Sequence, residues 1–225
     1  MRLRTACGLA GVLFLVALLA QGALRSGYDP VYQPGSALSL GENGWIQITN
    51  FIVCGLLLAV FGTGLRRCTG SIAGAALTVI GGVTLALAGV FSMDPMRGFP
   101  PGTPAGTPST FTWEHQVHDM AGALTFTSLP LACLVLAFRL PGWWRVYLLV
   151  NGVAGLVLFV WYGTAYEADA PYAGLVQRVA ITVDLTWPAA LALLRPVLPV
   201  AHGRRSGGMP PSVPGGGVPP SAPRY

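Results

Sequence analysis

The chain has 225 residues, of which 53% are hydrophobic and only 9% are charged, and its mean hydropathy is +0.61. A soluble domain carries about 25% charged residues, so this composition excludes an ordinary water-exposed fold and predicts an integral membrane protein. The net charge of +5 does not indicate a nucleic-acid-binding protein, because the basic residues are all arginines that lie in small groups between apolar runs.

Six apolar runs of membrane-spanning length follow one another along the chain. We predict transmembrane helices at about 6–24, 45–65, 72–91, 117–138, 144–164 and 175–198, since a span needs about 20 mostly apolar residues. Backbone groups in lipid must be hydrogen-bonded within a helix or a closed barrel, and the alternating segments of barrel strands are missing from the sequence. The expected fold is therefore an all-α membrane protein, a bundle of six transmembrane helices over residues 1–198.

The first run allows two interpretations. Arg2 and Arg4 precede it, and Ala20 and Gly22 could form the small-residue cleavage site of a signal peptide. The run is about 19 residues long, however, which exceeds the usual apolar core of roughly 7–15 residues in a signal peptide. We therefore favour an uncleaved span.

The placement of arginines predicts the orientation of the bundle. One side receives ten of them: Arg2, Arg4, Arg66, Arg67, Arg139, Arg145, Arg195, Arg204, Arg205 and Arg224. The other side receives three arginines and seven acids: Arg25, Arg97, Arg178, Asp29, Glu42, Asp94, Glu114, Asp119, Glu167 and Asp169. Because arginine-rich connections stay inside the cell, both termini are predicted to be cytoplasmic.

The last segment, 199–225, differs in composition from the rest of the chain. It is rich in proline and glycine and cannot bury a core. We expect a disordered cytoplasmic tail.

The longest polar connection, at about 92–116, holds the least ordinary residues. Its many prolines predict a stiff, non-helical loop that folds back over the outer helix ends. The loop leads into His115, His118 and Asp119, which lie near one another on a helix because residues three and four apart share a face. We interpret them as a solvated helix end, as a divalent metal or proton site, or as a site for a specific lipid headgroup; no other cofactor is predicted.

Asp184 is the acid that lies deepest in a predicted span. Placing a charge there costs about 2.5–3.5 kcal/mol, so the carboxylate should face the bundle and find a partner. Arg178, Asn50, Asn151 and the two outer histidines are possible partners. The candidate outer-face polar site therefore comprises Asp94, His115, His118, Asp119, Asp184 and Arg178.

Several motifs together resemble a bacterial membrane family known as domain of unknown function 998. They are Pro34-Gly-Ser-Ala-Leu-Ser39, Gly44-Trp-Ile-Gln47, Phe91-Ser-Met-Asp-Pro95, Gly98-Phe-Pro-Pro-Gly-Thr-Pro104 and the stretch from His115 to Asp119. The resemblance implies a six-helix protein, expected in the plasma membrane, and implies no activity.

Three functions remain open at this stage. The first is a non-enzymatic scaffold or sensor that binds membrane lipids or a partner. It requires the fewest specialised residues in the sequence. The second is an outer-face, metal-dependent membrane hydrolase that uses His115, His118 and Asp119. The third is a small transporter in which Asp184 binds a proton or a cation.

Overall fold

The computed structural model describes residues 6–194, and these residues form helices and connections without a β-strand. The helices are α2 (Ala10–Leu24), η1 (Gly35–Ser39), α3 (Gly44–Thr69), α4 (Ile72–Val90), α5 (Trp113–Ala137), α6 (Trp143–Glu167) and α7 (Ala173–Leu194). The prediction of an all-helical fold is confirmed, and each of the six apolar runs corresponds to one α-helix. The tail and the last four residues of the sixth run lie outside the described residues.

Local signals in the sequence explain where several helices begin and end. Ser71 is the N-cap of α4, and its hydroxyl accepts a hydrogen bond from the backbone N–H of Gly74 at 3.0 Å. Thr112 has the same role for α5, with the N–H of His115 at 3.2 Å. Gly70 ends α3 with a φ of 68°, which glycine adopts without steric cost.

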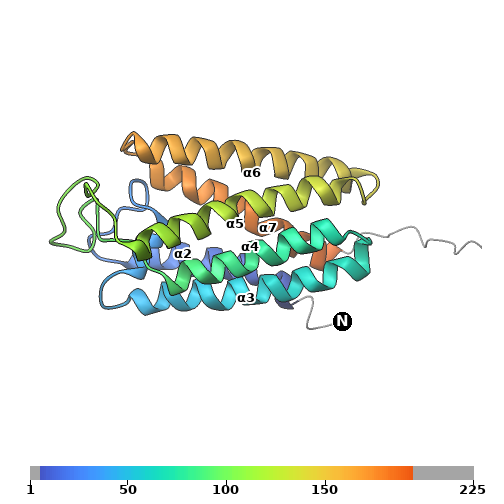
Figure 1. Ribbon diagram of the computed structural model, residues 1–225, viewed down its shortest axis with the longest axis horizontal. Coiled ribbons are helices and arrows are strands. Elements are labelled where there is room, and N and C mark those ends of the chain that lie inside the picture. The colour runs from blue at the N-terminus through green and yellow to red at the C-terminus, as the bar shows by residue number, and fades with distance from the viewer. Residues whose placement is uncertain (1–5, 195–225) are drawn as a thin grey trace, which may run out of the picture.

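The α-helices run up and down as a bundle whose two ends differ (Figure 1). At one end, short turns join α3 to α4 and α5 to α6. At the other end, two long connections at 25–43 and 91–112 and the short turn at 168–172 gather over the helix ends, and η1 lies in the first of them. We call these three connections the cap. The prediction that the proline-rich loop folds over the helix ends is confirmed.

Glycines allow α3 and α4 to pack closely. A Cβ atom on Gly82 would lie 2.7 Å from the carbonyl oxygen of Gly55, and a Cβ on Gly55 would lie 2.6 Å from that of Gly82. Such distances are too short for real side chains, so the two backbones touch at this crossing. These glycines are therefore packing positions, as small residues often are between helices in membranes.

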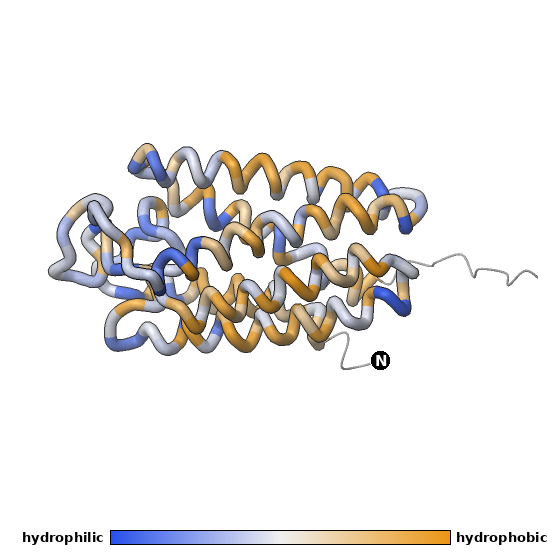
Figure 2. Tube along the Cα trace, in the orientation of Figure 1, coloured by the Kyte–Doolittle hydropathy of each residue, from blue (hydrophilic) through white to orange (hydrophobic). Residues whose placement is uncertain are grey.

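Apolar residues form a band along the middle of the helices, and polar residues collect at both ends of the bundle (Figure 2). Within the described residues, α3, α4, α5 and α6 are long and apolar enough to cross a membrane. The apolar helix α2 is shorter, and α7 carries Arg178 and Asp184. The bundle is therefore of a membrane type, and crossing by all six helices stays a prediction.

Candidate functional site

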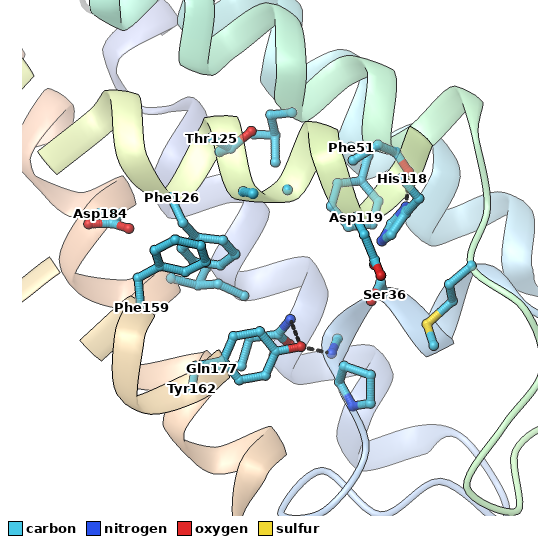
Figure 3. A pocket seen from close by; sticks show the side chains of 18 of the residues that line it. Ser36, Phe51, His118, Asp119, Thr125, Phe126, Phe159, Tyr162, Gln177 and Asp184 are labelled. Carbon is cyan, nitrogen blue, oxygen red and sulfur yellow. Dashed lines mark hydrogen bonds between the residues drawn. The ribbon is translucent and has the colours of Figure 1, made fainter. Parts of the chain in front are cut away.

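A cavity of about 250 Å³ lies inside the bundle below the cap, and all six α-helices contribute to its wall. Figure 3 shows it from close by. The larger apolar residues of the wall are Phe14, Leu18, Phe51, Leu85, Met93, Phe126, Leu129, Phe159, Ile181 and Leu185. The polar residues of the wall are Ser36, Gln47, His118, Asp119, Thr125, Tyr162, Tyr166, Glu167, Gln177 and Asp184. An apolar chamber with a few polar groups is the usual form of a small-molecule site.

The cavity reaches the surface between α5 and α6. The exposed wall residues lie on these two helices, at Asp119, Ala123 and Glu167, whereas the wall residues from α2 and α7 are buried. The two helices lie close together at the end with short turns and diverge toward the cap (Figure 1). The opening is thus on the side of the bundle.

The cap closes the cavity at its end. Met93 and the segment from Pro34 to Ser36 line the cavity from the cap. The side chain of Gln177 holds this segment, because its Oε1 accepts a hydrogen bond from the N–H of Gly35 at 2.7 Å. The amide of Gln177 also donates to the hydroxyl of Tyr162 at 3.0 Å, and this pair is visible in Figure 3.

His115 is buried at the start of α5 and joins the cap to the helix. Its Nδ1 accepts a hydrogen bond from the N–H of Asp94 at 2.8 Å, so a neutral ring carries its proton on Nε2. That Nε2 lies 3.1 Å from Oδ2 of Asp119, an ion-pair distance without hydrogen-bond geometry. The ring also stacks on Phe111, with centroids 4.2 Å apart. These contacts identify His115 as a structural residue of the cap.

Asp94 fixes the end of the proline-rich loop against the N-terminus of α5. Its two carboxylate oxygens accept hydrogen bonds from the N–H and the hydroxyl of Thr112, at 2.8 and 2.7 Å. Burial acts to raise the pKa of Asp94, but the Thr112 hydrogen bonds and the neighbouring His115 outweigh it and lower the pKa below its ordinary value.

His118 lies one turn further along α5 and contacts the end of α4. Its Nδ1 lies 2.8 Å from the carbonyl oxygen of Ala88 and 2.9 Å from that of Phe91. Both oxygens can only accept, so Nδ1 carries a proton and satisfies carbonyls that the end of a helix leaves free. This contact orients the ring at the cavity wall.

The predicted metal set of His115, His118 and Asp119 finds no support in this geometry. Within residues 6–194, no three side chains of His, Cys, Asp or Glu come together in a group that could hold a metal ion. His115 faces Asp119, whereas the Nδ1 atom of His118 is directed at backbone carbonyls. The three residues share a helix end, where His115 contacts the cap, His118 contacts the end of α4, and Asp119 is exposed at the cavity wall.

Asp184 lies in the interior, as predicted, and its side chain lines the cavity. The residue is 2% exposed, and neither carboxylate oxygen has a hydrogen-bond partner among the described residues. It is eleven positions after the start of α7, or about 16 Å along the helix at 1.5 Å per residue. In Figure 3 it lies on one side of the view, and Asp119 and His118 lie on the other.

The partners proposed for Asp184 are engaged elsewhere. Arg178 donates to the carbonyl oxygens of Gln33 and Gly174, at 3.1 and 2.8 Å, and to the hydroxyl of Tyr28. Asn50 donates to the carbonyl oxygen of Phe14 at 3.1 Å. Asn151 accepts a hydrogen bond from Cys133 at 3.4 Å. Of the six predicted site residues, His118, Asp119 and Asp184 line the cavity, and Asp94, His115 and Arg178 support the cap.

Sequence reasoning did not identify the remaining polar residues of the wall, most notably Tyr162, Gln177 and Gln47. One signal was present, because Gln47 and Gln177 follow the same Gly-x-x pattern at the start of two spans. Both glutamines line the cavity. An amide one turn inside an apolar helix is unusual enough to mark a position that faces the interior.

The fold and the cavity define an all-helical protein of membrane type with a chamber inside its bundle. The model of the family described as "Protein of unknown function (DUF998)" matches residues 9–194. The chain therefore belongs to this family, and the resemblance found from the motifs is confirmed. Comparison with curated proteins and with solved structures gave no match.

Proposed function

We propose that this protein is a non-enzymatic membrane protein that binds a single-chain amphiphile, such as a lipid fragment, in the cavity. One observation carries the proposal: the chamber opens sideways between the cap ends of α5 and α6, at the level where the headgroups of a membrane meet the acyl chains, while the cap covers its end. Its volume of about 250 Å³ is just below the ~300–1,000 Å³ typical of small-molecule pockets, which favours one chain over a two-chain lipid.

The proposal includes six crossings of a bacterial plasma membrane with both termini in the cytoplasm. The charges of the described residues support this arrangement. Arg66, Arg67, Arg139 and Arg145 lie at the end with the short turns, and the acids other than Asp184 lie at the cap end. The positive-inside rule then puts the cap outside the cell and the cavity within the outer leaflet.

Filling the cavity is the direct test. Gly163 lines the cavity on α6, and a Cβ atom added there would meet nothing within 4 Å. Gly163→Leu should therefore enter the chamber without disturbing the backbone. The experiment measures the saturable binding of two radiolabelled probes, 1-dodecanol and dodecyltrimethylammonium. The protein is held in nanodiscs of a zwitterionic lipid. We expect the variant to lower the affinity for whichever probe binds by tenfold or more.

Val160→Leu is the matched control, because Val160 lies on the same helix and is 65% exposed on the outside of the bundle. It should bind the probes as the wild type does. Absence of saturable binding of both probes to the wild type would rule the proposal out, and so would equal binding by all three proteins.

A cation- or proton-coupled transporter is the second candidate, and the unpartnered carboxylate of Asp184 favours it. A transporter needs a path from its binding site to the cytoplasmic side of the membrane. Below the cavity, however, the bundle is filled by Leu136, Leu140, Leu148 and Trp187, none of which is exposed. A cysteine at position 184 that reacts with polar thiol reagents from the cytoplasmic side would favour transport over binding. A metal-dependent hydrolase is the least supported of the three, because its ligands do not converge.

A further inference from the structure

The charges on the cavity wall have one predominant sign. Asp119 and Glu167 lie at the opening and Asp184 lies deeper, and no arginine lines the wall that the structure describes. Lysine cannot supply a counter-charge, because the chain contains none. The buried arginines of the described residues, Arg97 and Arg178, are engaged by acceptors in the cap. The chamber therefore has the electrostatics of a site for a cation.

Asp184 is the group in this wall that most requires a ligand. Its side chain is almost wholly buried, and both oxygens are without a hydrogen-bond partner in the described part of the chain. A buried carboxylate of this kind is costly unless a positive charge or hydrogen-bond donors come to it. Asp119 and Glu167 do not share this cost, since both are exposed to solvent.

The surroundings of Asp184 favour an organic cation over a metal ion. Oδ1 of Asp184 packs against Gly155, where a Cβ atom would collide with it, and Pro130 packs against the same glycine. The rings of Phe126 and Phe159 stack 5.5 Å apart and lie between Asp184 and Tyr162 in Figure 3. Calcium and magnesium ions take six or more oxygen ligands, whereas an alkylammonium group is stabilised by one carboxylate together with aromatic faces.

We propose that the cavity selects amphiphiles whose head is a protonated amine or a quaternary ammonium, with Asp184 as the counter-ion and the apolar chain directed out between α5 and α6. This inference rests on the proposed function and adds the chemical class of the ligand. Asp119 and Glu167 attract the cation to the opening, and the stacked pair Phe126 and Phe159 lines the cavity beside Asp184.

The test compares two probes of equal chain length, dodecyltrimethylammonium and 1-dodecanol, on the full protein in nanodiscs. The quaternary ammonium keeps its charge at every pH, so the comparison reports the head group alone. We expect the wild type to bind the ammonium at least tenfold more tightly than the alcohol, which corresponds to about 1.4 kcal/mol. Equal affinity of the wild type for the two probes would overturn the inference without any variant.

Asp184→Asn keeps the shape of the side chain and removes its charge. It should lose the preference for the ammonium, and its affinity for the alcohol should stay within about twofold of the wild type. Thr182→Val is the control, because Thr182 lies on the same helix, faces outward and does not line the cavity. Phe159→Leu keeps the carboxylate and should weaken ammonium binding severalfold, which provides a second variant if Asp184→Asn does not fold.

The outcomes separate the two proposals. If both probes bind, Gly163→Leu prevents binding and Asp184→Asn retains the wild-type preference, then the cavity binds amphiphiles and the role given to Asp184 is wrong. If neither probe binds saturably, the proposed function fails first, and the inference fails with it.

Discussion

Arg97 connects the three parts of the cap through its side chain and its backbone carbonyl. The residue is buried, and its guanidinium lies 3.2 Å from Oδ1 of Asp169 and 4.0 Å from the centre of the Tyr166 ring. It also donates to the backbone carbonyl oxygen of Tyr166, and its own carbonyl accepts from the amide of Gln33 at 2.8 Å. The proline-rich loop is thereby tied to the first connection and to the end of α6.

Arg97→Gln should loosen the cap and leave the helices in place. The substitution removes the cation that Asp169 and Tyr166 share, and a desolvated cation–π contact alone is worth about 2 kcal/mol. We expect the thermal midpoint to fall by several degrees and limited proteolysis to cut within 92–112 sooner than in the wild type. Arg139→Gln is the control, because Arg139 is exposed in the turn between α5 and α6, at the end of the bundle opposite the cap. It should change neither the thermal midpoint nor the rate of cleavage. Equal cleavage rates would show that Arg97 does not hold the cap.

Asp184 and His118 illustrate which properties of a site residue the sequence alone can predict. Asp184 could be identified from the sequence because it is a charge deep in an apolar run, and charge in lipid is costly. The sequence could not show that Asp184 lacks a hydrogen-bond partner among the described residues, because this depends on how six helices are rotated about their axes. The role of His118 was hidden for the same reason, because its acceptors, Ala88 and Phe91, belong to another helix.

Close contact of backbones determines how α3 and α4 pair. At their crossing, a Cβ on Gly82 would meet the backbone nitrogen of Ala59 as well as the carbonyl oxygen of Gly55. Backbone atoms within a helix cannot move aside as the tip of a side chain can. Gly82→Val should therefore push the helices apart and lower the free energy of unfolding by about 1–3 kcal/mol or more, as overpacking does.

Thermal unfolding in detergent, followed by circular dichroism, measures this effect. Gly122→Ala is the matched control, since a Cβ on this glycine of α5 would meet nothing within 4 Å and alanine favours a helix. The control should unfold at or slightly above the wild-type midpoint. If the two substitutions had the same effect, close packing of α3 on α4 would not be important for stability.

At the scale of elements, the helices were predictable and the cap was predictable only in outline. Apolar length sets the position of a membrane-type helix, and the signals at Ser71, Gly70 and Thr112 set its ends. The short helix η1 carries no periodic pattern that would mark it. It is held by contacts from elsewhere in the chain, such as the hydrogen bond from the N–H of Gly35 to Gln177.

The whole molecule is asymmetric along its long axis, and this asymmetry predicts its orientation. Exposed arginines occupy the turns at one end, as at Arg66 and Arg139, and the opposite end carries the cap with its acids. If the bundle lies in a membrane, the cap faces away from the cytoplasm. The cavity then opens into the outer leaflet, so the orientation also decides which lipids can reach Asp184.

Single cysteines placed at the two ends test this orientation. In a Cys68→Ser background, Ser109→Cys lies in the cap and Arg139→Cys lies in the turn between α5 and α6, and both positions are exposed. A membrane-impermeant maleimide applied to right-side-out spheroplasts should label position 109 at once and position 139 only after the membrane is permeabilised, because only the cap would face the medium. The reverse pattern would place the cavity in the cytoplasmic leaflet, and labelling of both positions without permeabilisation would mean that the bundle does not separate its two ends across a membrane.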